Sequence, residues 1–108
     1  MATSLTLVFD RFGQQNEAIL ASNKLSFGYV DGSFYESLQP VALALPKGIE
    51  NNGELETQDA YGNPLTYVSA GLLAPRLAAL PQKTAWSDGV AAFVGTLPPD
   101  MRIVLDWS

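Results

Sequence analysis

The chain has 108 residues, of which 47% are hydrophobic and 16% charged, and this balance favours one self-folding domain over a disordered chain. It contains no cysteine and no histidine, which excludes disulfides, thiolate or imidazole metal ligands, and Ser-His-Asp or Cys-His catalysis within one chain. The net charge is −5, and the six cations are scattered along the chain. We therefore expect no nucleic-acid partner, because phosphate recognition needs a basic surface.

The first third of the chain predicts two strands. Apolar residues take every second position in residues 3–10 and again in residues 24–30, the pattern of a strand with one buried face. Gly28 lies within the second pattern and predicts a bulge or a close backbone approach. Residues 17–22 fit either a strand or a helical turn, because a short apolar run does not distinguish the two, and we favour strand or loop.

A short helix is predicted next. Ser33 and Glu36 have the spacing of a capping box, in which the two side chains bond the helix N-terminus. Phe34 and Leu38 would face the core, and Pro40 ends the segment.

Residues 41–45 alternate between larger and smaller apolar side chains and lie between two prolines. This favours a third strand, whose alanine face predicts a closely packed neighbour. A helix is the alternative, because Ala and Leu also favour helices.

The middle of the chain predicts a loop and a hairpin. Residues 47–53 are expected to form a loop, with Asn52-Gly53 its most flexible point. Residues 54–58 alternate polar and apolar and predict an exposed strand, paired with residues 65–68 across the Tyr61–Pro64 turn.

Two helices are expected after this hairpin. Ser69 can cap a helix over residues 70–80, in which Pro75 causes either a kink, which we favour, or a split into a turn and a second helix. Thr84 can cap the next helix. That helix carries the strongest helical stripe in the chain, formed by Trp86, Val90, Phe93, Val94 and Leu97.

The chain ends with an apolar strand, residues 102–107, which we place inside the sheet rather than at its edge. Trp86 and Trp107 both keep the apolar stripe of their element and are expected in the core. The predicted fold class is α+β, in a single domain spanning residues 1–108. It has a single-layer, mostly antiparallel sheet of about five to six strands, with two C-terminal helices packed on one face and the first and last strands side by side near its centre.

Carboxylates offer the first candidate site. Asp10, Asp31 and Asp106, with nearby tyrosines, could in principle supply general acid–base catalysis. Asp10 and Asp106 lie at strand ends on the polar side of the alternation, where a solvated acid is the ordinary occupant. We favour that structural interpretation.

An acidic run offers the second candidate. Glu50, Glu54, Glu56 and Asp59 fall within ten residues that contain no cation, and Tyr61 follows on the turn. These five residues form the predicted partner-binding site. The competing interpretation is a solvated hairpin edge, with Tyr61 packed over its own turn.

These observations predict a small, acidic, non-enzymatic module that binds another protein, such as an inhibitor, adaptor or immunity-type protein docking on a basic surface. The alternatives are a self-associating subunit, for example a homodimer, or a hydrolase that uses carboxylates and tyrosines. No cofactor, metal or phosphate-binding loop is indicated. No apolar run approaches the roughly 20 residues of a membrane span, and we expect a cytoplasmic location.

Overall fold

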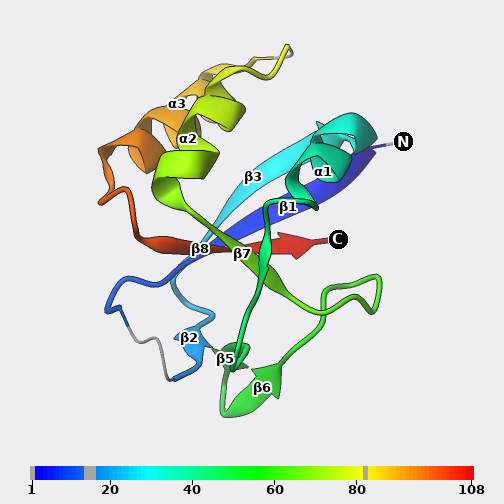
Figure 1. Ribbon diagram of the computed structural model, residues 1–108, viewed down its shortest axis with the longest axis vertical. Coiled ribbons are helices and arrows are strands. Elements are labelled where there is room, and N and C mark those ends of the chain that lie inside the picture. The colour runs from blue at the N-terminus through cyan, green and yellow to red at the C-terminus, as the bar shows by residue number, and fades with distance from the viewer. Residues whose placement is uncertain (1, 14–16, 82) are drawn as a thin grey trace.

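The computed structural model describes residues 2–13, 17–81 and 83–108. Within these residues the chain forms eight strands and three helices (Figure 1). In chain order they are β1 (Ala2–Phe9), β2 (Ile19–Leu20), β3 (Lys24–Asp31), α1 (Gly32–Leu38), β4 (Leu43–Ala44), β5 (Ile49–Asn51), β6 (Glu54–Glu56), β7 (Thr66–Ser69), α2 (Ala70–Ala78), α3 (Ala85–Thr96) and β8 (Arg102–Trp107).

The main sheet has five strands in the order β3-β1-β8-β7-β4, and every neighbouring pair is antiparallel. The first and last strands of the chain are therefore hydrogen-bonded at its centre, as predicted, with Leu7 opposite Leu105. The predicted irregularity at Gly28 is a bulge, because the β1–β3 register shifts between Leu5 and Thr6 and Gly28 has a φ of 115°.

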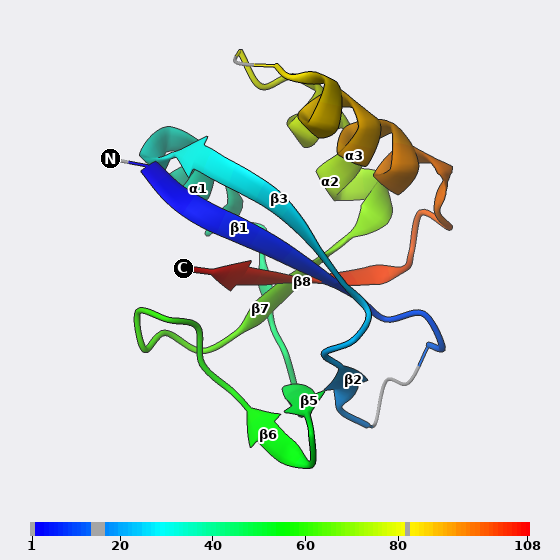
Figure 2. The same cartoon turned by 180° about the vertical axis from the view of Figure 1, so that it is seen from behind.

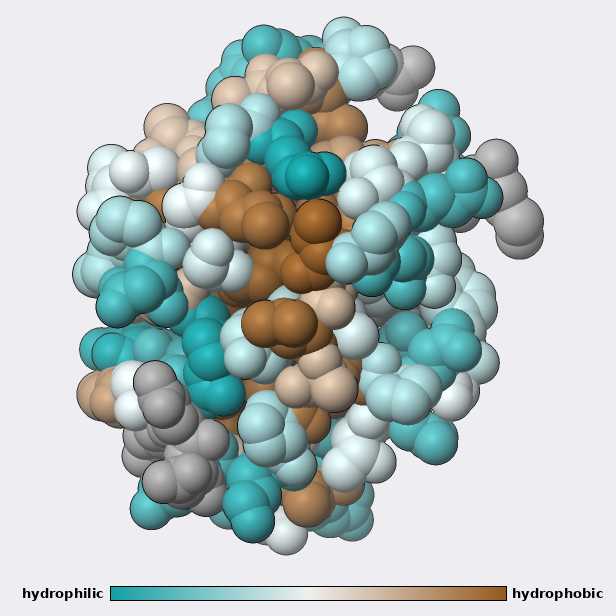
Figure 3. Space-filling model, in the orientation of Figure 1, coloured by the Kyte–Doolittle hydropathy of each residue, from teal (hydrophilic) through white to brown (hydrophobic). Residues whose placement is uncertain are grey.

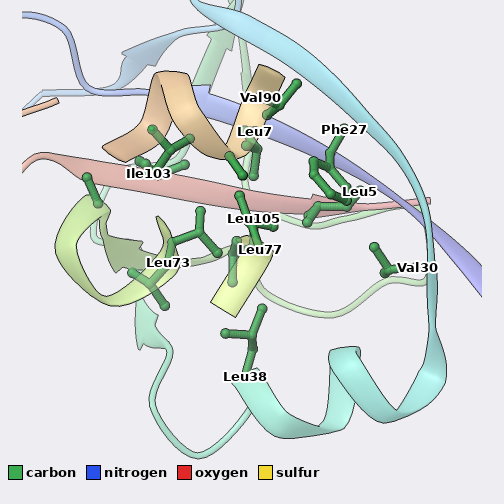
Figure 4. Close-up of a cluster of buried hydrophobic side chains, with 14 of the residues drawn as sticks. Leu5, Leu7, Phe27, Val30, Leu38, Leu73, Leu77, Val90, Ile103 and Leu105 are labelled. Atoms are coloured by element: carbon green, nitrogen blue, oxygen red, sulfur yellow. The ribbon is translucent and has the colours of Figure 1, made fainter. Parts of the chain in front are cut away.

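One face of the main sheet forms the principal core. The alternation of β1 and β8 directs large apolar side chains to this face, and α1, α2 and α3 all cover it (Figure 4). Burying one such leucine contributes about 2 kcal/mol. The predicted α+β class, with an antiparallel sheet and two C-terminal helices on one face, is thus confirmed. The buried residues that β1 and β8 supply are Leu5, Leu7, Phe9, Ile103, Leu105 and Trp107.

A second, small sheet was not predicted. It has the order β2-β5-β6, with β2 parallel to β5 and β5 antiparallel to β6. Ile19 and Ile49 pack from this sheet onto Val8 and Val104, on the face of the main sheet opposite the helices. The small sheet therefore covers part of the second face.

The predicted pairing of residues 54–58 with residues 65–68 is wrong for β6, which pairs with β5 instead. Asn52 and Gly53 have φ values of 52° and 85°, which suit a two-residue hairpin turn rather than a flexible loop. Only the end of the predicted hairpin exists, as a bridge between Gln58 and Pro64. The Asn52-Gly53 pair was therefore a stronger indication of a hairpin turn than the Tyr61–Pro64 segment.

The helix caps follow local chemistry, with one correction. Asp31, not Ser33, caps α1, because its carboxylate accepts from the Ser33 backbone N–H at 3.3 Å. Ser69 and Thr84 cap α2 and α3 as predicted. Pro75 lies inside a single α2, so the split alternative is wrong.

Two further expectations fail at the margins of the fold. The predicted strand over residues 41–45 shortens to β4 at the sheet edge, where Leu43 is 58% exposed and Ala44 is also exposed. Of its two alanines, Ala42 precedes β4 and packs against the principal core, whereas Ala44 is uncovered. Trp86 is 55% exposed, whereas Trp107 is buried as expected. Trp86 lies on the flank of α3 and donates its indole N–H to the Ser26 carbonyl of edge strand β3, at 2.9 Å.

Apolar and polar surfaces are separated on the outside of the molecule. Figure 3 shows apolar surface in the middle of one face, over the space between α1 and α2 and down the segment that follows α1. Hydrophilic surface lies on both sides of it. In the described part of the chain, no helix is long and apolar enough to cross a membrane.

Candidate protein-binding surface

Strands β5 and β6, which carry three of the predicted binding residues, lie at the end of the molecule farthest from α2 and α3 (Figures 1 and 2). The turn that follows β6 lies at the side of the molecule, beside the end of β8. Glu50 belongs to β5, Glu54 and Glu56 belong to β6, and Asp59 and Tyr61 follow β6 in a turn. Asp59 is half-buried and the other four are exposed.

The hairpin divides these carboxylates between two sides. Residues directly opposite on antiparallel strands share a side, and Glu56 is opposite the buried Ile49. Glu56, and Glu54 two residues before it, therefore face the main sheet. Glu50 is opposite the exposed Leu55 on the outer side, where it lines an open pocket of about 360 Å³. The acidic run of the sequence is thus not one continuous surface.

Asp106 of β8 joins the residues on the inner side. Burial raises its pKa above the usual 3.8, and the negative charges of Glu56 and Asp59 raise it further, while Lys24 acts in the opposite direction. Glu56 and Asp59 therefore lie close enough to Asp106 for their charges to act on it, and we call these three residues the acidic cluster. The sequence placed Asp106 on the polar side of its strand but could not show that β6 lies against it.

The turn after β6 is held rigidly by Asp59. Its Oδ1 accepts from the backbone N–H groups of Tyr61 at 2.9 Å and Asn63 at 3.1 Å. The next residue, Ala60, donates its N–H to the Trp107 carbonyl at 3.1 Å, which ties the turn to the end of β8. Asp59 thus has a structural role as well as a charge.

Tyr61 is presented in a fixed position with much of its ring in solvent. The side chain is 57% exposed, and its hydroxyl lies 3.0 Å from Thr3 Oγ1. Thr3 Oγ1 in turn donates to the Ser108 carbonyl at 3.0 Å. The ring is therefore anchored at its tip to the end of β1 while its surface stays accessible.

The remaining candidate carboxylates have structural roles. Asp10 is buried and accepts from Arg102 Nε and Nη2, each at 2.9 Å, which contradicts the expectation that it is a solvated acid. Asp31 caps α1. Asp10 and Asp106 also lie at opposite ends of β8, so Asp10, Asp31 and Asp106 do not form one constellation. Among the described residues, no group of three acidic side chains is arranged to hold a metal ion.

Comparison with known proteins gives no relative: no protein family, curated protein or solved structure matches this chain. A functional proposal must therefore come from the chemistry of these surfaces.

Proposed function

We propose that this chain is a small, non-enzymatic protein-binding module that docks on a basic protein surface. Glu54 and the acidic cluster would provide the electrostatic attraction, and Tyr61 would provide the anchor. The observation that carries this proposal is the convergence of carboxylates from β6, its following turn and β8 beside an exposed, fixed tyrosine.

The acidic cluster supports a cationic partner because Glu56 and Asp59 disfavour the negative charge of Asp106 in the free protein. Asp106 is half-buried near Glu56 and Asp59, so its ionised form is held at an energetic disadvantage. A Lys or Arg from a partner would relieve this repulsion and would be attracted over a distance before contact.

Tyr61 supports a specific contact rather than general attraction. Tyrosine is among the residues enriched at the energetic centres of interfaces. Its tip is already held by Thr3 and its backbone by Asp59. Binding would therefore immobilise few additional degrees of freedom, which favours affinity.

Two parts of the proposal stay predictions. A cytoplasmic location and an inhibitor, adaptor or immunity-type role follow from the sequence expectations alone. The hydrolase alternative gains no support from the carboxylate geometry, since Asp10 is paired with Arg102 and Asp31 caps a helix.

The experiment begins with capture of partners from native lysate, followed by binding kinetics at two salt concentrations. The variant Glu54→Gln/Glu56→Gln should slow association and weaken its salt dependence, because steering charges act mainly on the association rate. Tyr61→Ala should speed dissociation about tenfold or more if the ring is an anchor. Tyr61→Phe should retain most of the ring contact.

The matched control is Glu36→Gln/Asp100→Asn, which removes two exposed charges elsewhere on the chain. It should leave association nearly unchanged. Equal effects of the two double variants would indicate net charge rather than a site. Unchanged rates in both hairpin variants would remove this surface from the interface and overturn the proposal.

A further inference from the structure

The α2–α3 pair differs in charge from the rest of the chain. Residues 70–96 contain two cations and one carboxylate, Arg76, Lys83 and Asp88, for a net charge of +1. The remaining residues therefore carry −6, since the whole chain carries −5. The two helices also lie at the end of the molecule opposite β5 and β6 (Figures 1 and 2). Two copies that meet through these nearly neutral helices therefore repel each other less than two copies that meet through their acidic parts.

An open groove of about 390 Å³ runs between the two helices. Its walls carry small side chains, so another surface can approach the helix backbones closely. Lys83 and Asp88 also line it. The small residues are Ala74, Pro75 and Ala78 from α2 and Ala91, Ala92 and Gly95 from α3.

The exposed side of α3 is unusually apolar for a surface helix, which ordinarily presents charged residues to solvent. Trp86 is 55% and Phe93 46% exposed, and both lie on the flank of α3 that meets the sheet, where Trp86 bonds Ser26 and Phe93 packs on Phe9. The groove lies on the other flank of α3, where Asp88 is the only charged residue of the helix. Gly89 has open space where a Cβ would lie, so nothing within the described chain requires a glycine there. A glycine inside a helix costs up to about 1 kcal/mol relative to alanine.

We propose that this α2–α3 face binds the same face of a second copy of the chain. Two charged residues that line the groove favour a second copy of the chain as its partner. Lys83 and Asp88 have opposite signs and line one groove, and neither forms an ion pair within the described residues. A two-fold arrangement that brings Lys83 of one copy to Asp88 of the other makes this contact twice, so the groove is able to complement itself in charge.

Self-association through this face goes beyond the proposed function and does not depend on it. The dimer would leave the acidic cluster of each copy uncovered, because β6, the turn after it and the end of β8 all lie away from α2 and α3 (Figures 1 and 2). Two binding surfaces on one particle would raise the apparent affinity for a repeated or multimeric basic partner.

The first test is sedimentation velocity on the full chain from micromolar to submillimolar concentration. The mass of the wild type should rise from monomer to dimer across this range. Ala92→Glu places a charge in the groove at an exposed helical position and should raise the dimer dissociation constant at least about tenfold. Ala44→Glu adds the same charge at an exposed position of β4 and should leave the dissociation constant within about twofold.

The second test reverses the two charges. Lys83→Glu and Asp88→Lys should each weaken the dimer, because each places like charges opposite one another. The double variant Lys83→Glu/Asp88→Lys should recover most of the lost affinity. Far-UV circular dichroism and urea unfolding of every variant would separate loss of association from loss of folding, which matters because Asp88 also lies favourably in the first turn of α3.

A wild type that stays monomeric over the whole range would overturn the proposal. So would a dimer that is equally sensitive to Ala44→Glu and Ala92→Glu, or charge reversals whose effects simply add. None of these three results would bear on the binding kinetics of the acidic cluster, which are measured with different variants.

Discussion

The two faces of the main sheet are built by the same strands but reach different solutions. On the helix face, β1 and β8 contribute a continuous set of buried apolar side chains, and three helices cover them (Figure 4). On the opposite face, β8 alternates Arg102, Val104 and Asp106. Val104 is covered by the small sheet, Arg102 is paired with the buried Asp10, and Asp106 lies near two other carboxylates.

This difference shows where stability and function can be separated in the fold. The helix face is a large, continuous core, so its residues contribute chiefly to stability. The opposite face is covered only in part, and its charged residues are tolerated either in an ion pair or near solvent. The acidic cluster lies on this second face, where a change of charge can alter binding without emptying the core.

The largest expected effect comes from truncating the two cores in turn. Leu7→Ala on the helix face should lower the unfolding free energy by about 4 kcal/mol, because a fully buried leucine is lost from a core that cannot collapse around the cavity. Ile49→Ala in the small cluster should cost about 2 kcal/mol, because the short strands around it can relax. Urea unfolding followed by tryptophan fluorescence measures both. Equal losses would show that the small sheet is as rigid as the principal core.

The next effect concerns the buried ion pair. Arg102→Ala should cost about 3 kcal/mol, because it leaves the Asp10 carboxylate buried without its guanidinium partner. The same change also removes the guanidinium that lies 5.3 Å from the centre of the Tyr67 ring. Asp10→Asn/Arg102→Met should recover much of the loss, since no uncompensated charge then remains. A double variant less stable than Arg102→Ala would show that the pair itself stabilises the fold.

The principal core was predictable because its signals are local and repeated. The alternation of β1 and β8 and the stripe of α2 each specify a buried face without reference to the rest of the chain. The stripe of α3 also located Val90 and Val94 correctly but placed Trp86 in the core. The Trp86 indole bonds the edge strand β3 instead. Helical periodicity shows which side of a helix is apolar, but it does not distinguish the centre of the buried face from its exposed margin.

The second face was less predictable because it depends on contacts between distant segments. The sequence interpretation took Asn52-Gly53 as the flexible point of a loop, whereas it is a hairpin turn, and β2 and β5 are too short to show a period. Glu54 and Glu56 were recognised as exposed acids, whereas the proximity of Glu56 to Asp106 follows from the small sheet lying over β8. Likewise, the pairing of Asp10 with Arg102 joins residues at opposite ends of the chain and has no local signature.

A third prediction tests how firmly the small sheet is fixed. Gly48 has a φ of 97°, and a Cβ there would collide with the Glu56 carbonyl. Gly48→Ala should therefore cost about 2 kcal/mol and disturb the β5–β6 pairing that positions Glu56. Gly53→Ala is the matched control, because its φ is also positive but its Cβ would meet nothing within 4 Å. It should cost about 1 kcal/mol. Equal losses would show that the carbonyl contact is relieved without consequence.

The smallest effect on stability is the one that connects the second face to binding. Asp106→Asn should raise the unfolding free energy near neutral pH, because it removes a charge that burial, Glu56 and Asp59 disfavour. The gain should be below about 1 kcal/mol, since the side chain is half-exposed and solvent screens the repulsion. Urea unfolding at a series of pH values measures it, with Asp100→Asn as an exposed control that should change little.

The gain in stability from Asp106→Asn should depend on pH, because it comes from removing the charge of Asp106. The pKa of Asp106 is higher in the folded state than the ordinary 3.8, so the folded protein holds this proton more tightly than the unfolded chain. As the pH falls through the folded pKa towards 3.8, Asp106 of the wild type binds a proton and loses its unfavourable charge, so the wild type becomes more stable relative to its unfolded chain. The amide of Asp106→Asn does not titrate, so the variant gains nothing over this interval. The advantage of Asp106→Asn should disappear over that interval. The same substitution should also be tested for binding to a basic partner at neutral pH. If it weakens binding, the charge of Asp106 both destabilises the free protein and contributes to recognition, a trade of stability for function that is common at binding sites. A gain that persists below pH 3.8 would instead assign the effect to packing or hydrogen bonding of the amide.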